Sequence, residues 1–205
     1  MNPALTALAE RFRAAGYECF LVGGAVRDAL LGRETTDIDL ATNAEPPAVK
    51  ALLQASGAEA VWAVGERFGT IGAKLAGLHV EVTTYRAEEY TPGSRKPVVR
   101  FGQTLEGDLA RRDFTINAIA QDLRTGALID PFGGQADLQA RLVRAVGDPD
   151  ERFAEDPLRL LRAVRFVAQL DFRLEPATAA AIERRAAALR DISQERIAQE
   201  MHKLL

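Results

Sequence analysis

The sequence predicts an α+β domain that is followed by a helical domain. Short apolar runs with strand-like alternation and segments with helical apolar spacing intermingle up to about residue 148, where the strand signals vanish. Hydrophobic residues make up 47% of the 205 residues, which is enough for a sizeable core. We therefore expect two domains, an α+β domain over residues 1–147 and a helical domain over 148–205.

The elements of the first domain are indicated by periodicity and by glycine and proline. Helical spacing predicts a helix over 3–15 that ends at Gly16, because glycine readily adopts the left-handed backbone after a helix. Period-two alternation predicts a strand over 37–41 with one solvent-exposed face. The other expected elements are a strand over 19–22, a helix over about 25–31, a helix over about 46–56, strands near 59–64, 69–75 and 78–84, a long loop over 86–103, and a hairpin with strands at 119–122 and 127–130.

The second domain is expected to contain helices near 157–170, 176–189 and 194–205. In the first of these helices we expect the core residues to be Leu160, Leu161, Val164 and Phe166. Ser193 is predicted to cap the last helix, and Arg196 and Glu200 are predicted to form an i,i+4 ion pair on it. We expect this helix to give structural support to the first of the three. The sequence stops within an amphipathic pattern, which suggests that it is truncated.

Composition excludes several classes of protein. No apolar run is long enough for a membrane helix, and charges throughout the N-terminal segment argue against a secretion signal. Cys19 is the single cysteine, so a disulfide framework is excluded and we expect a buried thiol and a cytoplasmic location. His79 and His202 lie far apart in the sequence, which argues against a His/Cys metal cluster. The net charge of −3 is unusual for a protein that binds nucleic acid.

Two aspartates on one predicted strand are the strongest local signal. Asp37 and Asp39 are two residues apart, so their carboxylates project from the same face and reach the same site. Carboxylate oxygens are the ligands that Mg²⁺ prefers. An isolated pair of this kind is more often a solvated strand edge, but an EF-hand is excluded because Thr42 stands where its loop needs glycine.

A glycine pair precedes these acids. Gly23 and Gly24 lie between a strand and a helix, where backbone N–H groups favour an anion, and Arg27 adds positive charge one turn later. A glycine pair alone more often serves a tight turn, and neither a dinucleotide fingerprint nor a P-loop is present. Together with Asp37 and Asp39, however, the pair supplies parts that could hold Mg²⁺ and a triphosphate.

At this point the sequence resembles a known family. LVGGAVRDALLGRETTDIDLAT at 21–42 is similar to the first motif of the class II tRNA nucleotidyltransferases, the CCA-adding or A-adding enzymes and bacterial poly(A) polymerases of the DNA polymerase β superfamily. Further resemblances follow in the same order, namely VEVTTYR at 80–86, RRDFTINAIA at 111–120, DPFGG at 130–134, EDPLRLLRAVRF at 155–166 and SQERIAQE at 193–200. The resemblance implies a nucleotidyltransferase head with a mixed β-sheet, an all-helical neck, and the absence here of the body and tail domains that grip tRNA.

The resemblance also implies a reaction, namely template-independent addition of C and/or A to the 3′ end of tRNA from CTP and ATP. Asp37 and Asp39 would hold two Mg²⁺ ions, and no covalent protein nucleophile would be needed. Glu81 could be a third acid at this site or an ordinary polar strand residue. Arg111, Arg112 and Asp113 resemble the motif that contacts the sugar, the alternative being a surface charge cluster. Neither a membrane nor an obligatory protein partner is indicated.

Base selection is expected from the segment around Asp156. Asp156 before Pro157 has the form of a helix N-cap, so Arg159 falls on the same helix face, and Arg162 lies three residues further on. A carboxylate beside a guanidinium presents an acceptor and donors that match the polarity shared by cytosine and adenine and reject uracil and guanine. The alternative is a capping aspartate with an incidental ion pair.

Three related activities and one different class remain open. The length of the 86–103 loop argues against an enzyme that adds only C, because the family pattern shortens the loop there. VGERFGT at 64–70 lacks a second basic residue that we associate with poly(A) polymerases, which favours the tRNA enzymes. A non-catalytic nucleotide- or RNA-binding module of the same fold is the alternative of a different class. Trp62 and the other scattered aromatic residues need no cofactor to explain them.

Overall fold

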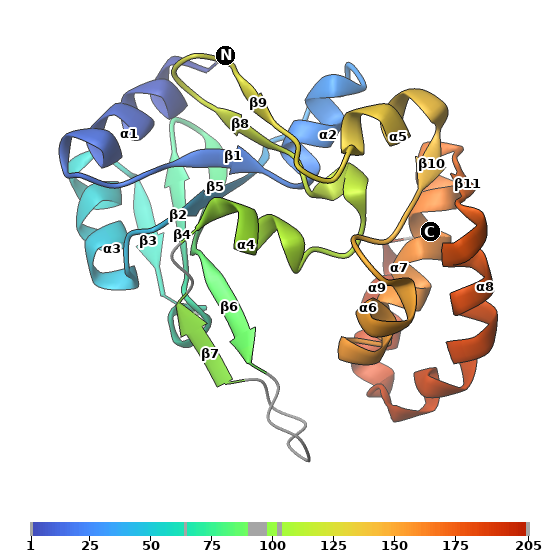
Figure 1. The fold of residues 1–205 in the computed structure, drawn as a ribbon. Helices are drawn as coiled ribbons and strands as arrows, with labels where there is room; N and C mark the ends of the chain where they lie inside the picture. The colour runs from blue at the N-terminus through green and yellow to red at the C-terminus, as the bar shows by residue number, and fades with distance from the viewer. Residues whose placement is uncertain (1, 64, 90–97, 102–103, 204–205) are drawn as a thin grey trace. The chain divides into compact units, whose positions relative to one another are not determined.

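The structure is a computed structural model, and it describes residues 2–63, 65–89, 98–101 and 104–203 (Figure 1). The chain forms two compact units: Met1–Arg111 with Ile119–Pro131, and Arg112–Ala118 with Phe132–Leu205. Residues 112–118 and 132–147 thus group with the helices of the second unit. The boundary between residues 147 and 148, which separates the expected catalytic head from the expected helical neck, stays a prediction.

A mixed seven-stranded sheet dominates the first unit, in the order β3-β4-β5-β2-β1-β8-β9 (Figure 1). The pairing of β2 with β5 is parallel, and the other neighbours in the sheet are antiparallel. The strands are β1 (Phe20–Val22), β2 (Asp37–Thr42), β3 (Ala60–Trp62), β4 (Thr70–Leu75), β5 (Leu78–Thr84), β8 (Ala120–Asp122) and β9 (Leu128–Ile129). The expected strands of the head and its mixed sheet are confirmed.

The two faces of this sheet differ in chemistry because residues alternate along each strand. On β2, Ile38 and Leu40 are buried, whereas Asp37 and Asp39 are exposed. Helices α1 (Pro3–Ala14) and α3 (Pro46–Ala55) pack on one another, and α3 also contacts β3, β4 and β5 (Figure 1). Burial of the apolar face leaves the acidic residues of β2 on the other face.

The helices of this unit begin and end as their local sequences dictate. The side chain of Asn2 accepts a hydrogen bond from the backbone N–H of Ala4, and Gly16 after α1 has a φ of +85°. Helix α2 (Gly24–Leu30) follows Gly23, whose φ of +70° and ψ of −135° favour glycine. A short 3₁₀ helix, η1 (Glu66–Phe68), joins β3 to β4.

Residues 86–103 differ from the long loop that we expected. Strands β6 (Arg86–Glu89) and β7 (Val98–Phe101) pair antiparallel, and helix α4 (Leu105–Ala110) follows, capped by the side chain of Thr104. The segment of β6 has no alternation of apolar and polar residues. Strand pairing joins backbone groups, so a strand of this kind cannot be recognised from its side chains. The centre of the expected loop, residues 90–97, lies outside the described residues.

The second unit is built mainly of helices. The three predicted helices are confirmed, as α7 (Leu158–Leu170), α8 (Pro176–Arg185) and α9 (Gln194–His202), with the end of the second replaced by the 3₁₀ helix η3 (Ala186–Asp191). The elements that we did not predict are η2 (Thr115–Asn117), α5 (Gly134–Ala140), α6 (Pro149–Glu155) and the two-residue strands β10 (Leu142–Val143) and β11 (Arg173–Leu174), which pair parallel. The expectation that strands are absent after residue 148 is therefore wrong at β11.

The core of the second unit forms around α7. Leu160 and Phe166 are buried as expected, and the Phe166 ring meets that of Phe114 edge-on at 5.7 Å between centroids. Val164 is 48% exposed, so its prediction as a core residue is wrong, and its neighbour Arg165 is buried instead. Residues 160, 163, 166 and 170 share the buried face of α7, which Val164 does not, whereas Arg165 lies on another face and is covered where it binds Glu200 of α9 (Gln194–His202).

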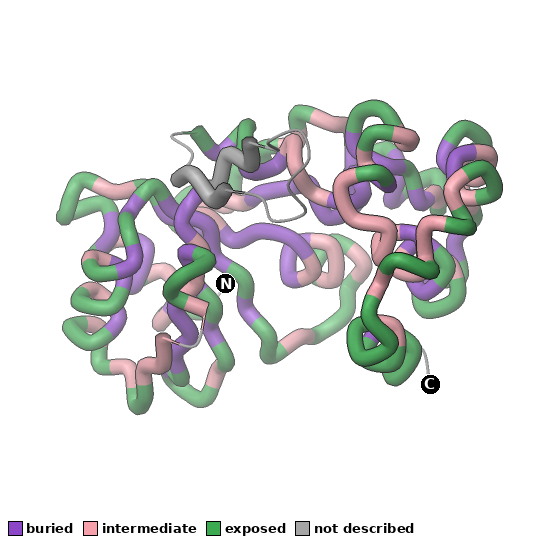
Figure 2. Tube along the Cα trace, turned by 90° about the horizontal axis from the view of Figure 1, so that it is seen from below, coloured by how far each residue is buried: buried purple, intermediate pink, exposed green. Residues whose placement is uncertain are grey.

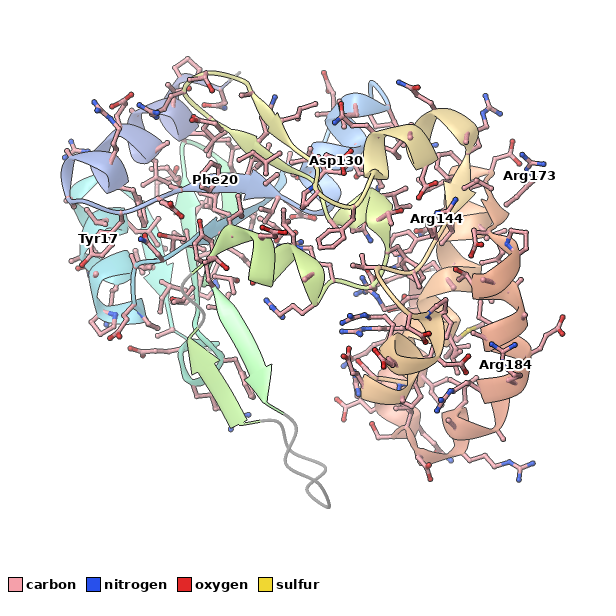
Figure 3. The ribbon with its side chains drawn as sticks, viewed as in Figure 1. Tyr17, Phe20, Asp130, Arg144, Arg173 and Arg184 are labelled. Carbon is pink, nitrogen blue, oxygen red and sulfur yellow. The ribbon has the colours of Figure 1, made fainter. Side chains whose placement is uncertain are left out.

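Buried and exposed stretches alternate along the chain, and successive helical turns of the tube change between the two (Figure 2). Among the described residues, no helix combines the length and the apolar character that a membrane span requires. In the second unit, the buried carboxylate of Asp137 accepts hydrogen bonds from the hydroxyl of Thr115 at 2.6 Å and from Nε of Arg144, which is labelled in Figure 3. These bonds join α5 to the segment 112–118.

Candidate functional site

A pocket of about 340 Å³ lies on the exposed face of the sheet in the first unit. Its lining residues are Asp37, Ile38, Asp39, Trp62, His79 and Glu81. Asp37 and Asp39 project from the same face of β2, with the buried Ile38 between them turned to the opposite face. The structure thus brings the two aspartates that the sequence singled out to a common space.

Glu81 belongs to the same surface. In the parallel pairing of β2 with β5, Asp39 is opposite Glu81 and Asp37 is opposite His79, and Glu81 is exposed like both aspartates. Three carboxylates on one face are a donor set that fits hard divalent cations. Among the described residues, however, no three Asp, Glu, His or Cys side chains are gathered as closely as a formed metal site requires. The residues present therefore fit a divalent metal by the chemistry of their oxygens.

Two aromatic residues complete the pocket, and sequence reasoning missed both. The rings of Trp62 and His79 lie 5.9 Å apart between centroids at an angle of 54°. Their strands are not neighbours, because β4 lies between β3 and β5. Only the register of the sheet reveals that these residues approach one another and the acids.

The glycine pair lies at the junction of β1 and α2. Gly23 has a backbone that glycine favours, so a turn requirement already explains this residue. The guanidinium of Arg27 donates from Nε and Nη2 to the two carboxylate oxygens of Asp28, at 2.9 Å each. The positive charge that we expected at this helix is thus shared with a neighbouring carboxylate.

The three charged residues at 111–113 have separate environments. Arg111, in the first unit, donates two hydrogen bonds to the buried carboxylate of Asp108, at 3.0 and 2.7 Å. Arg112, in the second unit, donates from Nη1 to the backbone oxygen of Asn117 at 3.4 Å. Asp108 was not recognised from the sequence, although it stands three residues before Arg111 on a helix, which is the spacing of an i,i+3 pair.

Asp113 is buried and fully engaged within the second unit. One carboxylate oxygen accepts from the N–H of Phe114 and the amide of Asn117, and the other accepts two bonds from Arg162, at 2.8 and 2.6 Å. Burial by itself would raise the pKa of Asp113, but the charge of Arg162 and these hydrogen bonds together hold the pKa below its ordinary value. Two predicted nucleotide-binding residues, Asp113 and Arg162, are therefore bound to one another.

Asp156 caps α7 as predicted. Its Oδ1 accepts from the backbone N–H of Leu158 at 3.1 Å, and its backbone oxygen accepts from the N–H of Arg159 at 3.0 Å. Its Oδ2 accepts from Nη2 of Arg196 on α9 at 2.8 Å. Nη1 of Arg159 instead donates to Glu155 at 2.6 Å and to the backbone oxygen of Arg152.

The predicted ion pair of Arg196 with Glu200 is wrong. Arg196 binds Asp156, and the buried carboxylate of Glu200 binds Nε of Arg165 on α7. Both partners lie on α7 or at its start, so tertiary contacts replace the local pair. The prediction that Ser193 caps α9 and that α9 supports α7 is confirmed.

Comparison with known proteins identifies the family. Residues 19–144 match the family described as the poly A polymerase head domain. The chain belongs to that family. Residues 171–205 of this head-domain protein also match a family described as the probable RNA and SrmB-binding site of polymerase A. The resemblance noted from the motifs is confirmed.

Curated relatives of this chain include CCA-adding enzymes. That of Geobacillus thermodenitrificans is 49% identical over 191 residues, which cover 93% of this chain and 46% of the relative. That of Levilactobacillus brevis is 47% identical over 192 residues, covering 93% of this chain and 47% of the relative. The chain thus spans about half the length of the curated relatives that it matches.

Solved structures confirm the fold of the head-domain protein. A Bacillus stearothermophilus CCA-adding enzyme in complex with CTP matches 100% of this chain and 49% of its own, with a TM-score of 0.87 and 44% identity. A tRNA nucleotidyltransferase complexed with a primer tRNA and an incoming ATP analog matches 95% of this chain and 55% of its own, with a TM-score of 0.79 and 34% identity.

Proposed function

We propose that this chain is the catalytic part of a template-independent tRNA nucleotidyltransferase, which adds C and/or A to the 3′ end of tRNA from CTP and ATP and releases pyrophosphate. The observation that carries the proposal is the placement of Asp37 and Asp39 on one exposed strand face, in one pocket. The relatives named as CCA-adding enzymes support the choice of substrate.

The acids of this pocket bind and orient the cofactor. Two Mg²⁺ ions are the cofactor that we expect, and when bound they neutralise phosphate charge and activate the RNA 3′-hydroxyl. Asp37 and Asp39 are the ligands, and Glu81, opposite Asp39 in the sheet, is the third acid. The reaction then depends on positioning and charge, so it needs no protein nucleophile.

The remaining site residues bind the nucleotide in this proposal. Gly23, Gly24 and Arg27 receive the triphosphate at the start of α2, and Arg111, Arg112 and Asp113 receive the sugar. Since Asp113 already accepts four hydrogen bonds, two on each oxygen, a ribose hydroxyl would have to replace one of the present donors.

Asp156 and Arg159 select the base, and Arg162, bonded to Asp113, helps to shape the pocket. A carboxylate has about four positions that accept a hydrogen bond. In Asp156, the N–H of Leu158 and the guanidinium of Arg196 fill two of these positions. Asp156 can therefore also accept from the amino group that cytosine and adenine share. Arg159, one helical turn on, donates to the ring nitrogen. A site that demands these bonds can discriminate by roughly 10⁴ or more.

We infer that this chain binds nucleotide but holds tRNA only weakly by itself. It carries a net charge of −3, whereas affinity for phosphate backbones usually accompanies a basic excess. We expect it to act in the cytoplasm, in keeping with its single, buried cysteine. Submicromolar tRNA affinity at physiological salt would contradict the first inference.

The test is incorporation of radiolabelled ATP and CTP into a tRNA that lacks its 3′ end, with Mg²⁺ present. We expect Asp39→Asn to reduce incorporation at least about 100-fold, the loss typical when a group that stabilises a transition state is removed. Asp171→Asn is the matched control, since Asp171 is 98% exposed in its side chain and has a φ of +58° that asparagine tolerates. Chelation of the metal should abolish incorporation.

The open alternatives give different products. A-adding enzymes extend only tRNA that already ends in CC, and a poly(A) polymerase extends unrelated RNA with A. Sequencing the 3′ ends made from CTP alone, ATP alone and both separates these outcomes. Nucleotide binding without any incorporation by the wild-type chain, at tRNA concentrations high enough to offset weak binding, would favour the non-catalytic module.

A further inference from the structure

Trp62 packs directly on a glycine of β4, the strand next to the β3 edge of the sheet. A Cβ atom placed on Gly72 would lie 2.0 Å from Nε1 of Trp62 and 2.4 Å from its Cε2, so the indole occupies the space that any side chain at this position would need. Trp62 is opposite Gly72 in the pairing of β3 with β4. Because Gly72 has no side chain, the indole of Trp62 can lie over β4 at that position.

The register places this indole in a row with the acids. Trp62 is opposite Gly72, Gly72 is opposite Glu81, and Glu81 is opposite Asp39, across four neighbouring strands. Residues directly opposite one another in a sheet share a face. Trp62 and Asp39 are thus on the same face, with the Gly72 gap and Glu81 between them, and His79 lies beside the indole.

The two sides of the acid pair differ. Strand β1, which leads into Gly23 and Gly24, pairs with β2 on one side, and β5, β4 and β3 follow on the other (Figure 1). Nucleotidyl transfer is an in-line displacement, so the attacking hydroxyl and the departing pyrophosphate lie on opposite sides of the reacting phosphorus. With the triphosphate on the glycine side, an RNA 3′ end that occupies the other side of the acids lies beside Trp62.

We infer that the indole of Trp62, with His79 tilted beside it, forms a stacking platform for the 3′-terminal base of the RNA acceptor. This inference rests on the proposed function of the pocket. Aromatic faces bind unpaired bases of any sequence, which suits an acceptor whose last base changes as the 3′ end grows. The pocket volume of about 340 Å³ lies within the range of small-ligand sites, roughly 300–1,000 Å³.

Kinetics with the substitution Trp62→Leu test the platform, because leucine keeps an apolar side chain and removes the aromatic face. Loss of one stacked base is expected to raise the KM for the RNA acceptor about tenfold or more, with the KM for ATP unchanged. Trp62→Tyr retains an aromatic face and should restore most of the RNA affinity. Phe68→Leu is the matched control, an exposed aromatic residue of the same unit that does not line the pocket.

Fluorescence provides a readout that is independent of turnover. Trp62 is the single tryptophan of the chain, so its emission reports on this position alone. We expect the dinucleotide CpC to quench the emission in the absence of divalent metal, and His79→Ala to weaken that binding. ATP alone should leave the emission unchanged.

The outcomes separate this inference from the proposed function. If wild-type chain incorporates nucleotide while Trp62→Leu keeps the wild-type KM for RNA, the platform is wrong and the proposed function stands. If CpC quenches Trp62 but no nucleotide is ever incorporated, the platform is supported and the proposed function fails. Equal loss of RNA affinity in Trp62→Leu and Trp62→Tyr would also overturn the platform, because it would indicate a packing role.

Discussion

Arg196 of α9 binds Asp156, the residue that caps α7, through a hydrogen bond of 2.8 Å between Nη2 and Oδ2. The two residues are 40 positions apart in the sequence. Asp156 is fixed on its other oxygen by the N–H of Leu158, so its carboxylate is held from two sides. Arg196 is therefore a positioning residue for the proposed base-reading carboxylate.

Arg196→Ala is expected to relax base selection more than it reduces stability. Both side chains are partly exposed, at 47% and 30%, and such ion pairs contribute only about 0–1 kcal/mol. We expect the ratio of kcat/KM for ATP over UTP to fall about tenfold, with Tm nearly unchanged. Arg184→Ala removes a comparable exposed pair with Asp150 in the same unit and should leave the ratio intact.

Asp113→Asn is expected to lower the free energy of unfolding at neutral pH by about 1–3 kcal/mol, the cost of leaving buried hydrogen-bonding groups poorly satisfied. Because the pKa of Asp113 is lower in the folded chain, its carboxylate contributes stability above the ordinary pKa of 3.8, and this contribution is lost as the pH falls through the folded value. Urea denaturation of both proteins should show a constant difference from pH 7 to about 5 that shrinks below about 4. A difference independent of pH would contradict the ionised state of Asp113.

The thiol of Cys19 is expected to resist alkylation in the folded chain. Burial, with a further contribution from the charge of Asp122, raises the pKa of Cys19 to about 12. The thiolate fraction at pH 8 is then roughly 10⁻⁴, which leaves almost no nucleophile. Iodoacetamide labelling followed by mass spectrometry should be slow for the native chain and fast in denaturant, whereas rapid native labelling would show that the thiol is accessible.

Gly72→Ala is expected to displace the indole of Trp62. The added methyl group would overlap Nε1 of Trp62 at 2.0 Å, and overpacking of this kind costs about 1–3 kcal/mol. A shifted Trp62 emission spectrum together with a raised KM for RNA is the expected result. Gly107→Ala, where the nearest atom is a side-chain oxygen at 3.1 Å, is the control, and an unchanged spectrum in Gly72→Ala would contradict the packing described here.

Local chemistry allowed much of the fold to be predicted from the sequence. The cap of Asp156, the exposed face of Asp37 and Asp39, and the left-handed Gly16 all depend on residues within a few positions of one another. The structure has each of these features at the residues that the sequence pattern predicted. The alternation of β2 and β5 likewise lies within each strand's own residues.

The errors and omissions involve contacts between distant segments. The partner of Arg196 is not its helical neighbour Glu200 but Asp156, and Glu200 is taken by Arg165. Trp62 and His79 meet only because β4 aligns their strands. Periodicity within one segment carries no information about such partners, which pairing and tertiary packing decide.

The parallel pairing of β2 with β5 has one more consequence. It places Glu81 opposite Asp39, and a shift of β5 by a single residue would turn Glu81 into the core and expose Val80 or Val82 in its place. The buried valines that oppose such a slip therefore protect the chemistry without ever touching a substrate. Inactivating substitutions are to be expected on the hidden side of the sheet, wherever alignment between these two strands is weakened.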